Sequence, residues 1–517
     1  MGGMVYHQPP SRDSAMSTVH CVVRRDTYRD SVELMRVAAE LERIPGVARA
    51  ALLMGTPANR RLLAEAGLLA GAAADARPDD LVIAVAAEGD VAAEAALAEA
   101  QHLLIVRPSR SGTLETPAPG TIADALAEAP DANLAIISTP GAYATAEALK
   151  ALKRRLHVFL WSDNVPIADE IELKRLARKK GLLVMGPDCG TAILDGVPLG
   201  FANAVRRGRI GLAGASGTGL QQVSCLIDRL GEGVSQVIGA GGRDLDERVG
   251  GLTMLAAIDF LAADPGTEVI VLVSKPPAPS VARQVLGIAC ASGKPVVVNF
   301  LGGDPDMIRE AGATPAITLE DAAGFAVALA RYGDARATGA CVPVPATRAS
   351  AHGGRFPVGQ RHVRGLFSGG TLCREAALIA DQMMGDAATH EMVDLGDDEY
   401  TVGRPHPMID FRLRNERIVA AAREPVTAVI LLDVVLGYGA HPDPAEALVP
   451  AVEQARAVAL EAGRALAVVA FVCGTVTDPQ DLARQESKLA AAGVTLAPSN
   501  AEAARLAAML VRDDSAP

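Results

Sequence analysis

The chain has 517 residues and a formal net charge of −12, and half of it is hydrophobic although only 3% is aromatic. This length predicts about two to four domains. The acidic balance argues against a nucleic-acid partner, because phosphate backbones are bound by clustered Lys and Arg. No apolar run is long and uncharged enough to span a bilayer, so we expect no membrane partner. Packing by Ala, Val, Leu and Gly suits parallel sheets covered by helices.

The first 17 residues contain Pro9-Pro10 and no apolar segment of the kind found in signal peptides. They are predicted to be a disordered extension. The seven cysteines are scattered and never form a Cys-x-x-Cys pair. We therefore expect no metal site and no disulfide framework, and a reducing cytoplasm as the location.

The first predicted domain is a small α/β unit at residues 18–109. Short apolar runs predict strands at 20–24, 47–54 and 81–86, and helical periodicity predicts helices at 30–41 and 91–100. A stretch rich in Pro, Ser, Thr and Gly follows at 107–120, which is typical of a linker.

A second unit at 121–205 alternates strands and helices. Strands are predicted at 134–138, 157–161 and 182–185, and helices at 143–153 and 169–180. This spacing suits βαβ units and therefore a parallel sheet. The last strand runs into the loop Gly186-Pro187-Asp188-Cys189-Gly190.

The rest of the chain consists of two similar segments, 206–335 and 360–513, joined by a predicted linker at 336–359. Each begins with a strand, a Ser-Gly-Thr turn and a helix. Each then has a strand that ends in a Gly- or Asp-rich turn, and closes with a helix led by Thr or Ser. Because the order of elements and turns coincides, duplication of one domain is the economical interpretation.

Two turns carry the strongest chemical signal in this duplication. They are Ser216-Gly217-Thr218 and Ser368-Gly369-Gly370-Thr371, and each follows a strand and opens a helix. Such a turn gathers free N–H groups at the positive end of a helix dipole, and glycine lets an anion approach closely. The sequence therefore predicts two phosphate cradles.

An ordinary helix cap is the alternative for either turn, because Ser and Thr are preferred capping residues. Two such turns at matching places favour function. Neither turn has the Gly-x-x-x-x-Gly-Lys-Ser/Thr pattern of a nucleotide hydrolase. No Gly-x-Gly-x-x-Gly follows the first strands, which weakens an interpretation as a dinucleotide oxidoreductase.

The segment from Arg209 to Thr218, with the loop that starts at Gly186, resembles the α subunit of succinyl-CoA synthetase. The chain resembles more closely the FdrA family of acyl-CoA synthetase-like proteins, which includes a subunit of the oxamate carbamoyltransferase type. Four motifs carry this resemblance, at 54–59, 162–165, 274–277 and 394–410. They span nearly the whole chain after residue 20, and the last is long enough to be specific.

The resemblance implies an α/β fold in which a Rossmann-like CoA-binding domain at 121–205 precedes two flavodoxin-like ligase domains. In the synthetase family a Gly-Pro-Asn-type loop ends the CoA-binding domain, which makes Gly186 and Asp188 candidate substrate-binding residues here. The Ser-Gly-Thr helix of that family cradles phosphate. CoA is therefore a possible ligand, and phosphate or carbamoyl phosphate an expected substrate.

The synthetase α subunit also carries a phosphorylated histidine in a Gly-His-Ala-Gly loop. The equivalent stretches here are Gly302-Gly303-Asp304-Pro305-Asp306-Met307 and Cys473-Gly474-Thr475-Val476-Thr477-Asp478, and neither contains histidine. A phosphohistidine relay is therefore not carried over by position. Acyl transfer directly to or from phosphate stays possible, since positioning and electrostatics supply most of such catalysis.

Other polar residues are candidates with a structural alternative. His406 lies between two prolines near Arg404, and both are candidate catalytic residues, although a histidine that caps a turn is about equally expected. Lys275 ends a strand and could meet a substrate carboxylate, or could be a solvated charge. Arg243 and Asp397 occupy equivalent turns of the two copies, where exposed loop charges are the alternative.

The resemblance implies a subunit of a carbamoyltransferase that converts oxalurate and phosphate into oxamate and carbamoyl phosphate in purine nitrogen catabolism. A nucleotide-dependent acyl-CoA ligase subunit is the second interpretation, and a non-catalytic CoA- or metabolite-binding partner is the third. No nucleotide-binding ATP-grasp region is visible, so further protein subunits are expected under the first two.

Overall fold

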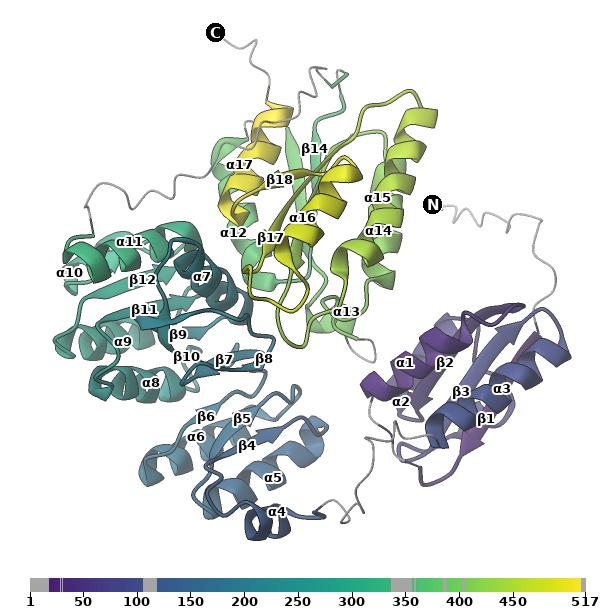
Figure 1. The fold of residues 1–517 in the computed structure, drawn as a ribbon, viewed down its shortest axis with the longest axis horizontal. Coiled ribbons are helices and arrows are strands. Elements are labelled where there is room, and N and C mark those ends of the chain that lie inside the picture. Colours follow the sequence, from purple (N-terminus) through teal and green to yellow (C-terminus); the bar gives the residue numbers. More distant parts are fainter. Residues whose placement is uncertain are drawn as a thin grey trace, which may run out of the picture. The chain divides into compact units, whose positions relative to one another are not determined.

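The computed structural model describes residues 18–27, 29, 31–105, 119–335, 356–357, 359–384, 388–401 and 405–512. The predicted extension at 1–17 and most of the predicted linker at 336–359 lie outside this range. The chain divides into two compact units, one of residues 1–118 with 398–405 and the other of 119–397 with 406–517 (Figure 1).

The first unit contains an antiparallel sheet in the order β1-β3-β2. Its strands are β1 (Thr18–Arg24), β2 (Val47–Met54) and β3 (Leu81–Ala87). Helices α1 (Ser31–Leu41) and α3 (Asp90–Ile105) pack on one face of the sheet, and α2 (Pro57–Glu65) and η1 (Gly71–Asp75) on the other. The whole of β3 is buried because both faces are covered. The strands and helices predicted here are confirmed.

The second unit begins with a parallel sheet in the order β4-β5-β6. Its elements are α4 (Ile122–Glu128), β4 (Leu134–Ile137), α5 (Gly141–Lys153), β5 (His157–Leu160), α6 (Ile167–Lys180) and β6 (Val184–Met185). A buried ion cluster joins α6 to the next sheet, because Lys174 Nζ lies 2.7 Å from Glu170 and 2.8 Å from Asp244.

A seven-stranded sheet follows, in the order β13-β12-β11-β9-β10-β7-β8. Its strands are β7 (Thr191–Leu194), β8 (Val197–Gly200), β9 (Arg207–Ala215), β10 (Val234–Gly239), β11 (Val269–Ser274), β12 (Val296–Phe300) and β13 (Thr314–Pro315). Its helices are α7 (Gly217–Arg229), α8 (Leu252–Ala263), α9 (Pro279–Ala291), α10 (Pro305–Glu310) and α11 (Leu319–Tyr332). The hairpin of β7 and β8 lies before residue 205, where the sequence interpretation drew a boundary, yet β7 is hydrogen-bonded to β10.

The last sheet is parallel and has the order β15-β14-β16-β17-β18. Its strands are β14 (His362–Phe367), β15 (Thr389–Asp394), β16 (Thr427–Val435), β17 (Ala467–Cys473) and β18 (Thr495–Ala497). Its helices are α12 (Gly370–Met383), α14 (Arg412–Arg423), α15 (Pro444–Glu461), α16 (Leu482–Ala491) and α17 (Asn500–Val511). A short helix, α13 (Asp398–Thr401), is part of the first unit.

The two larger sheets share one topology. Numbered along the chain from β9 and from β14, each sheet has the order 2-1-3-4-5, the flavodoxin-like arrangement. The closing helices are also capped alike, since Thr318 accepts a bond from Asp321 N and Ser499 from Glu502 N. The described structure therefore has the equivalent elements that the predicted duplication requires.

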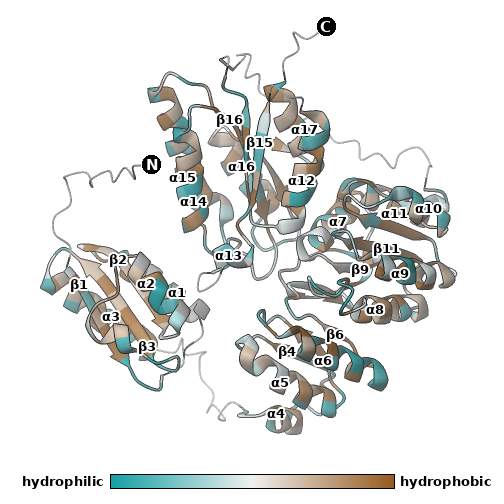
Figure 2. Ribbon diagram, turned by 180° about the vertical axis from the view of Figure 1, so that it is seen from behind, coloured by the Kyte–Doolittle hydropathy of each residue, from teal (hydrophilic) through white to brown (hydrophobic). Residues whose placement is uncertain are grey.

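The two copies pack through equivalent faces. A single hydrophobic core includes side chains of α7 and α11 from the first copy and of α12 and α17 from the second. The opposite face of the first copy is covered by α8 and α9, which have a core of their own. Figure 2 shows the apolar colour concentrated on the strands, with polar colour on parts of the helix surfaces. In the part of the chain that the structure describes, no helix is long and apolar enough to cross a membrane.

Candidate active site at two paired helix starts

Helix α7 starts at the carboxyl end of β9, and Ser216 is its cap. The Ser216 hydroxyl accepts a hydrogen bond from Gly219 N at 3.1 Å, and the side chain is buried. Within the described residues, the N–H groups of Gly217 and Thr218 donate to no protein acceptor. Those donors lie at the positive end of the α7 dipole, as an anion cradle requires.

Helix α12 starts in a different electrostatic setting, because the protein supplies its own anion there. Asp433 of β16 accepts hydrogen bonds from Ser368 N, from the Ser368 hydroxyl and from Gly369 N, at 2.9 to 3.1 Å. Its Oδ1 also lies 2.8 Å from Nη2 of Arg414, and both side chains are buried. Two of the predicted phosphate ligands therefore already hold a carboxylate. Within the described residues, the donors left at this helix start are the N–H groups of Gly370, Thr371 and Leu372.

The two helix starts lie against each other. The Ser216 hydroxyl and the Thr371 hydroxyl are 2.6 Å apart and buried. A Cβ atom on Gly369 would lie only 2.7 Å from Cγ2 of Thr218, so glycine is needed there for close approach. The two predicted turns therefore lie together, and the amino ends of α7 and α12 meet there.

A lysine and a carboxyl group flank the start of α12. A Cβ atom on Gly370 would lie 2.2 Å from Oδ2 of Asp394 and 3.6 Å from Nζ of Lys275. Lys275 comes from the first copy, directly after β11, and Asp394 ends β15 of the second. Burial raises the pKa of Asp394 to about 6, although the Gly396 N–H and the Lys275 charge oppose the shift. This carboxyl group can therefore take up and release a proton near neutral pH.

His406 and this carboxyl group both approach Gly396. Nε2 of His406 would be 2.9 Å from a Cβ atom on Gly396, and Oδ1 of Asp394 would be 3.2 Å from the same point. Burial lowers the pKa of His406 to about 4, so the ring is neutral at pH 7. Met408 N donates to Nδ1 at 3.3 Å, which leaves the hydrogen on Nε2.

Two further candidates belong to the same stretch of chain. Asp397 is exposed and close enough to add to the raised pKa of Asp394. Arg404, predicted to be catalytic, lies outside the described residues.

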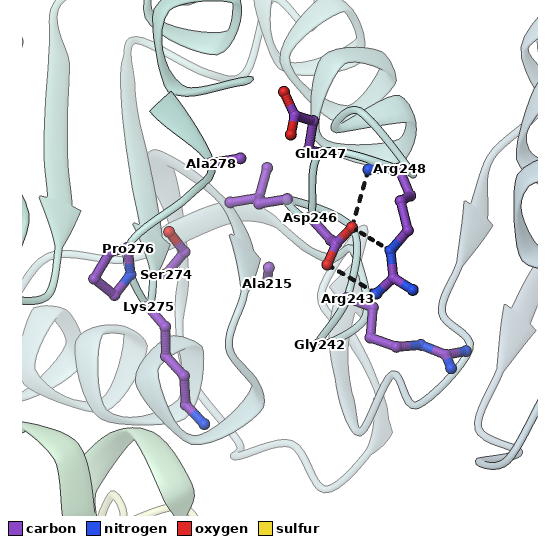
Figure 3. Close-up of a pocket in the computed structure, with 11 residues that line it drawn as sticks. Ala215, Gly242, Arg243, Asp246, Glu247, Arg248, Ser274, Lys275, Pro276 and Ala278 are labelled. Atoms are coloured by element: carbon purple, nitrogen blue, oxygen red, sulfur yellow. Dashed lines mark hydrogen bonds and ion pairs between the residues drawn. The ribbon is translucent and has the colours of Figure 1, made fainter. Parts of the chain in front are cut away.

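An open cleft of about 600 Å³ lies beside the start of α7 (Figure 3). Its lining includes Ala215 and Ser274, which end the neighbouring strands β9 and β11. This place between the first and third strands is the topological switch point, where open α/β sheets bind ligands. Lys275 lines the cleft and also approaches Gly370, so it connects the cleft with the paired helix starts.

Of the remaining predicted residues, Arg243 lines this cleft, and Gly186 and Asp188 lie beside the glycines that follow β10. Nη2 of Arg243 also bonds Val165 O at 2.7 Å and Glu170 at 2.9 Å. Asp188 is exposed, and its Oδ2 lies 3.1 Å from the Cβ position of Gly242 on the lining. Gly186 precedes Pro187 in a cis peptide bond and packs against Gly241. The predicted residues therefore form two groups, which Lys275 joins.

Sequence reasoning gave no role to Asp394, Asp433 or Ser274. Asp433 lies within the apolar strand β16, and a charged residue in such a position is rarely buried without a partner. That signal could have found Asp433, whereas Asp394 ends β15, whose sequence is not apolar. Ser274 gave no signal, because serine at a strand end is common.

Comparisons with known proteins agree with this architecture. A family model described as CoA-ligase matches residues 366–510, and one described as CoA binding domain matches 205–302. The family resemblance predicts the CoA-binding domain at 121–205, whereas the matching model covers 205–302. A third model, described as AllF, heavy metal-associated domain, matches 16–118.

The residues of this N-terminal region do not fit a heavy-metal site. Its only cysteine is Cys21, whose Sγ donates to Leu68 O at 3.2 Å and whose thiol pKa is raised by burial. Its two histidines, His20 and His102, each lie beside a carboxylate on the protein. The described residues hold no group of three or more potential metal ligands.

Relatives are found both along the whole chain and over parts of it. Uncharacterized protein YahF of Escherichia coli is 42% identical over 511 residues, which cover 95% of this chain and 98% of YahF. The α 2 subunit of the ADP-forming succinate–CoA ligase of Archaeoglobus fulgidus is 28% identical over 33% of this chain and 60% of its own length. A solved structure of acetyl-coenzyme A synthetase 1 from Ca. Korarchaeum cryptofilum is 17% identical, covers 78% of this chain and 87% of its own, and has a TM-score of 0.36. The chain therefore belongs to the family of YahF, within the succinyl-CoA synthetase α-like superfamily.

Proposed function

We propose that the chain is a subunit of a carbamoyltransferase that cleaves oxalurate with phosphate into oxamate and carbamoyl phosphate. The observation that carries this proposal is the meeting of two helix starts, with Ser216 and Thr371 in contact and Lys275 beside them. Free N–H groups of Gly217, Thr218, Gly370 and Thr371 and one ammonium group make a site for a single small dianion.

The proton balance of this reaction suits Asp394. A phosphate oxygen bonds to the ureido carbonyl carbon, and the bond from that carbon to the oxamate nitrogen breaks. The proton of hydrogen phosphate must end on this nitrogen. A carboxyl group whose pKa is about 6 can take the proton from phosphate and return it to the leaving nitrogen. The neutral Nε2–H of His406 would then hold the carboxylate or the substrate oxygen by a hydrogen bond.

Direct transfer is consistent with the histidines of this chain. The stretches at 302–307 and 473–478 contain none. His406 approaches Gly396, and its Nδ1 accepts a bond from Met408 N. A phosphoryl group at the site would instead remain on the substrate.

An acyl-CoA ligase is the second candidate, and the CoA-binding and CoA-ligase matches favour it. The cleft residues do not fit the several phosphates of CoA, because carboxylates lie among the cations of the lining. Arg243 is paired with Glu170, and Arg248 with Asp246. Asp246 and Glu247 add negative charge to the lining. A CoA-independent reaction therefore agrees better with this cleft.

Product analysis tests the proposal. The full chain, purified with the proteins encoded beside its gene as expected partner subunits, is incubated with oxalurate and phosphate and without nucleotide. Carbamoyl phosphate, detected by phosphorus NMR or through ATP formed by added carbamate kinase, is the expected product. Nucleotide- and CoA-dependent thioester formation would contradict the proposal. Binding of metabolites without turnover under either condition would favour the non-catalytic interpretation.

Variants connect the product to this site. Thr218→Val removes a hydroxyl, and Lys275→Met removes the charge beside Gly370. Each should lower turnover on the order of 100-fold, the typical effect of losing one donor to the transition state. Thr495→Val, on the edge strand β18, is the matched control and should leave turnover unchanged.

A further inference from the structure

The cleft at the switch point contains a buried hydroxyl with no partner on the protein. Ser274 is 1% exposed, and its Oγ lies within the described structure without any hydrogen-bond partner. It lines the cleft together with Lys275 and Pro276 (Figure 3). A buried unpaired hydroxyl costs free energy, so such a group points to a ligand that completes it.

The opposite part of the cleft carries two guanidinium groups. Arg248 holds Asp246 through Nε and Nη2, at 2.8 and 3.0 Å, and Arg243 makes its protein contacts through Nη2. A guanidinium has five N–H donors, so each of these side chains keeps donors for a further acceptor. In Figure 3 these arginines lie on the side of the cleft away from Ser274 and Lys275, with Ala215 between them.

The charge of the lining limits the kind of ligand. Arg243, Arg248 and Lys275 carry positive charge, while Asp246 and Glu247 carry negative charge. A polyanion would meet these carboxylates, whereas a small monoanion needs only one arginine edge. The neutral Ser274 hydroxyl instead suits an uncharged N–H or carbonyl group.

We propose that this cleft binds a short carboxylate that carries an amide or ureido group. The carboxylate contacts the remaining N–H edge of Arg248, and an N–H of the neutral group donates to Ser274 Oγ. Lys275 then lies between this ligand and phosphate at the paired helix starts. This inference rests on the proposed function, since it assigns the cleft to the oxamate part of the substrate.

Oxamate and pyruvate are suitable probes, because they share size and charge but pyruvate has a methyl group where oxamate has an amide. Titration calorimetry with the full chain should show oxamate binding about 10-fold more tightly than pyruvate, the contribution of one good hydrogen bond. Ser274→Ala should bring this ratio close to one without loss of pyruvate binding. Arg248→Met should weaken the binding of both oxamate and pyruvate.

Two further variants separate the cleft from the phosphate site and from folding. Thr218→Val should weaken inorganic phosphate but not oxamate, whereas Ser274→Ala should do the reverse. Ser224→Ala is the control for folding, because Ser224 is equally buried but its hydroxyl is bonded to Gln221 O. Ser224→Ala should change the binding of neither phosphate nor oxamate.

Equal binding of oxamate and pyruvate by the unchanged chain, or an unchanged ratio in Ser274→Ala, would overturn the inference. Absence of oxamate binding would do the same. If oxamate binds as expected and no carbamoyl phosphate forms, the proposed function fails and the cleft assignment stands. If carbamoyl phosphate forms and Ser274→Ala leaves KM for oxalurate unchanged, the cleft assignment fails alone.

Discussion

At the scale of single residues, the buried pair of Asp433 and Arg414 determines the shape of the second helix start. Arg414 bonds Leu366 O and the Asp433 side chain, and neither side chain of the pair is more than 1% exposed. Removing one partner of a buried ion pair leaves the other without compensation. The N–H groups of Ser368 and Gly369 keep their orientation only while Asp433 stays in place.

Arg414→Met should therefore destabilise the protein by about 3–5 kcal/mol, the usual cost of breaking a buried pair. Urea unfolding followed by circular dichroism measures this as a lower midpoint. Arg423→Met, on the exposed face of the same helix, is the control and should change stability by less than about 0.5 kcal/mol. Similar midpoints for the two variants would mean that Asp433 does not depend on Arg414.

Asp394 gives a prediction about pH. Its pKa is about 6 in the folded protein and ordinarily 3.8, so between these values the folded state keeps a proton that the unfolded state releases. Stability contributed by this group is present at pH 3.8 and below, and is lost as the pH rises to about 6. Two pKa units correspond to about 3 kcal/mol, which is an upper bound here.

Asp394→Asn cannot ionise, so it should be more stable than the unchanged protein at pH 8 by roughly 1–3 kcal/mol, and equally stable near pH 4. Urea unfolding at both values checks this. Asp259→Asn on the exposed side of α8 should show the same difference at both pH values. A stability gain from Asp394→Asn that does not depend on pH would contradict the raised pKa.

These residues also mark what the sequence could predict of the site. The two turns, Lys275 and His406 were predicted as candidates from local patterns, because a strand end followed by a helix start is a local feature. The partners of those residues come from distant parts of the chain: Asp433 is 65 residues from Ser368, and Thr371 is 155 residues from Ser216. Such long-range contacts decide which N–H and O–H donors remain free for a ligand. The local sequence pattern could therefore not reveal that the donors of Ser368 and Gly369 are bound to Asp433.

At the scale of elements, α7 and α12 approach each other so closely that one methyl group would separate them. Gly369→Ala places a Cβ atom 2.7 Å from Thr218 Cγ2, a contact that real Cβ atoms do not tolerate. The helices must move apart, and the bond from Ser216 to Thr371 should break. We expect a loss of about 1–3 kcal/mol, as for other overpacked sites, and weaker phosphate binding.

The control for this change is Gly287→Ala in α9. A Cβ atom at Gly287 would meet nothing within 4 Å, and alanine is favoured over glycine in a helix. That variant should be more stable by roughly 0.5–1 kcal/mol with unchanged phosphate binding. If Gly369→Ala gained stability as Gly287→Ala does, the inference that α7 and α12 approach too closely for a methyl group would be contradicted.

The elements themselves were easier to predict than their pairing. Apolar runs and caps predicted the strands and the helix starts because these depend on neighbouring residues. Whether a strand belongs to a sheet depends on hydrogen bonds to residues far away in the sequence. One example is the antiparallel pairing of β7 with β10, in which Ile193 lies opposite Val237. The boundary drawn at residue 205 therefore divided a sheet.

At the scale of the whole molecule, the second unit is held together across its two flavodoxin-like copies by polar contacts as well as by a shared core. Arg229 of α7 donates to Gly474 O, Pro498 O and Val472 O, at 2.9, 3.2 and 2.6 Å. Asn203 and Ala204 N bond to Asp478 of the second copy at 2.8 and 2.7 Å. Duplication was visible in the sequence, but which faces of the copies meet was not, because both faces of each sheet are apolar.

Because one core serves both copies, we expect them to unfold together, and Arg229 is the residue that tests this. Arg229→Met keeps an apolar stem but leaves three part-buried carbonyl groups without their donor, which should cost roughly 2–4 kcal/mol. Hydrogen exchange should then show a similar loss of protection in β11 and in β16, since either copy exposes the same core when the other opens. Arg283→Met, exposed on α9, should change neither strand. Loss of protection in only one copy would show that each copy is stable by itself, and the paired helix starts would then be a contact between separate domains.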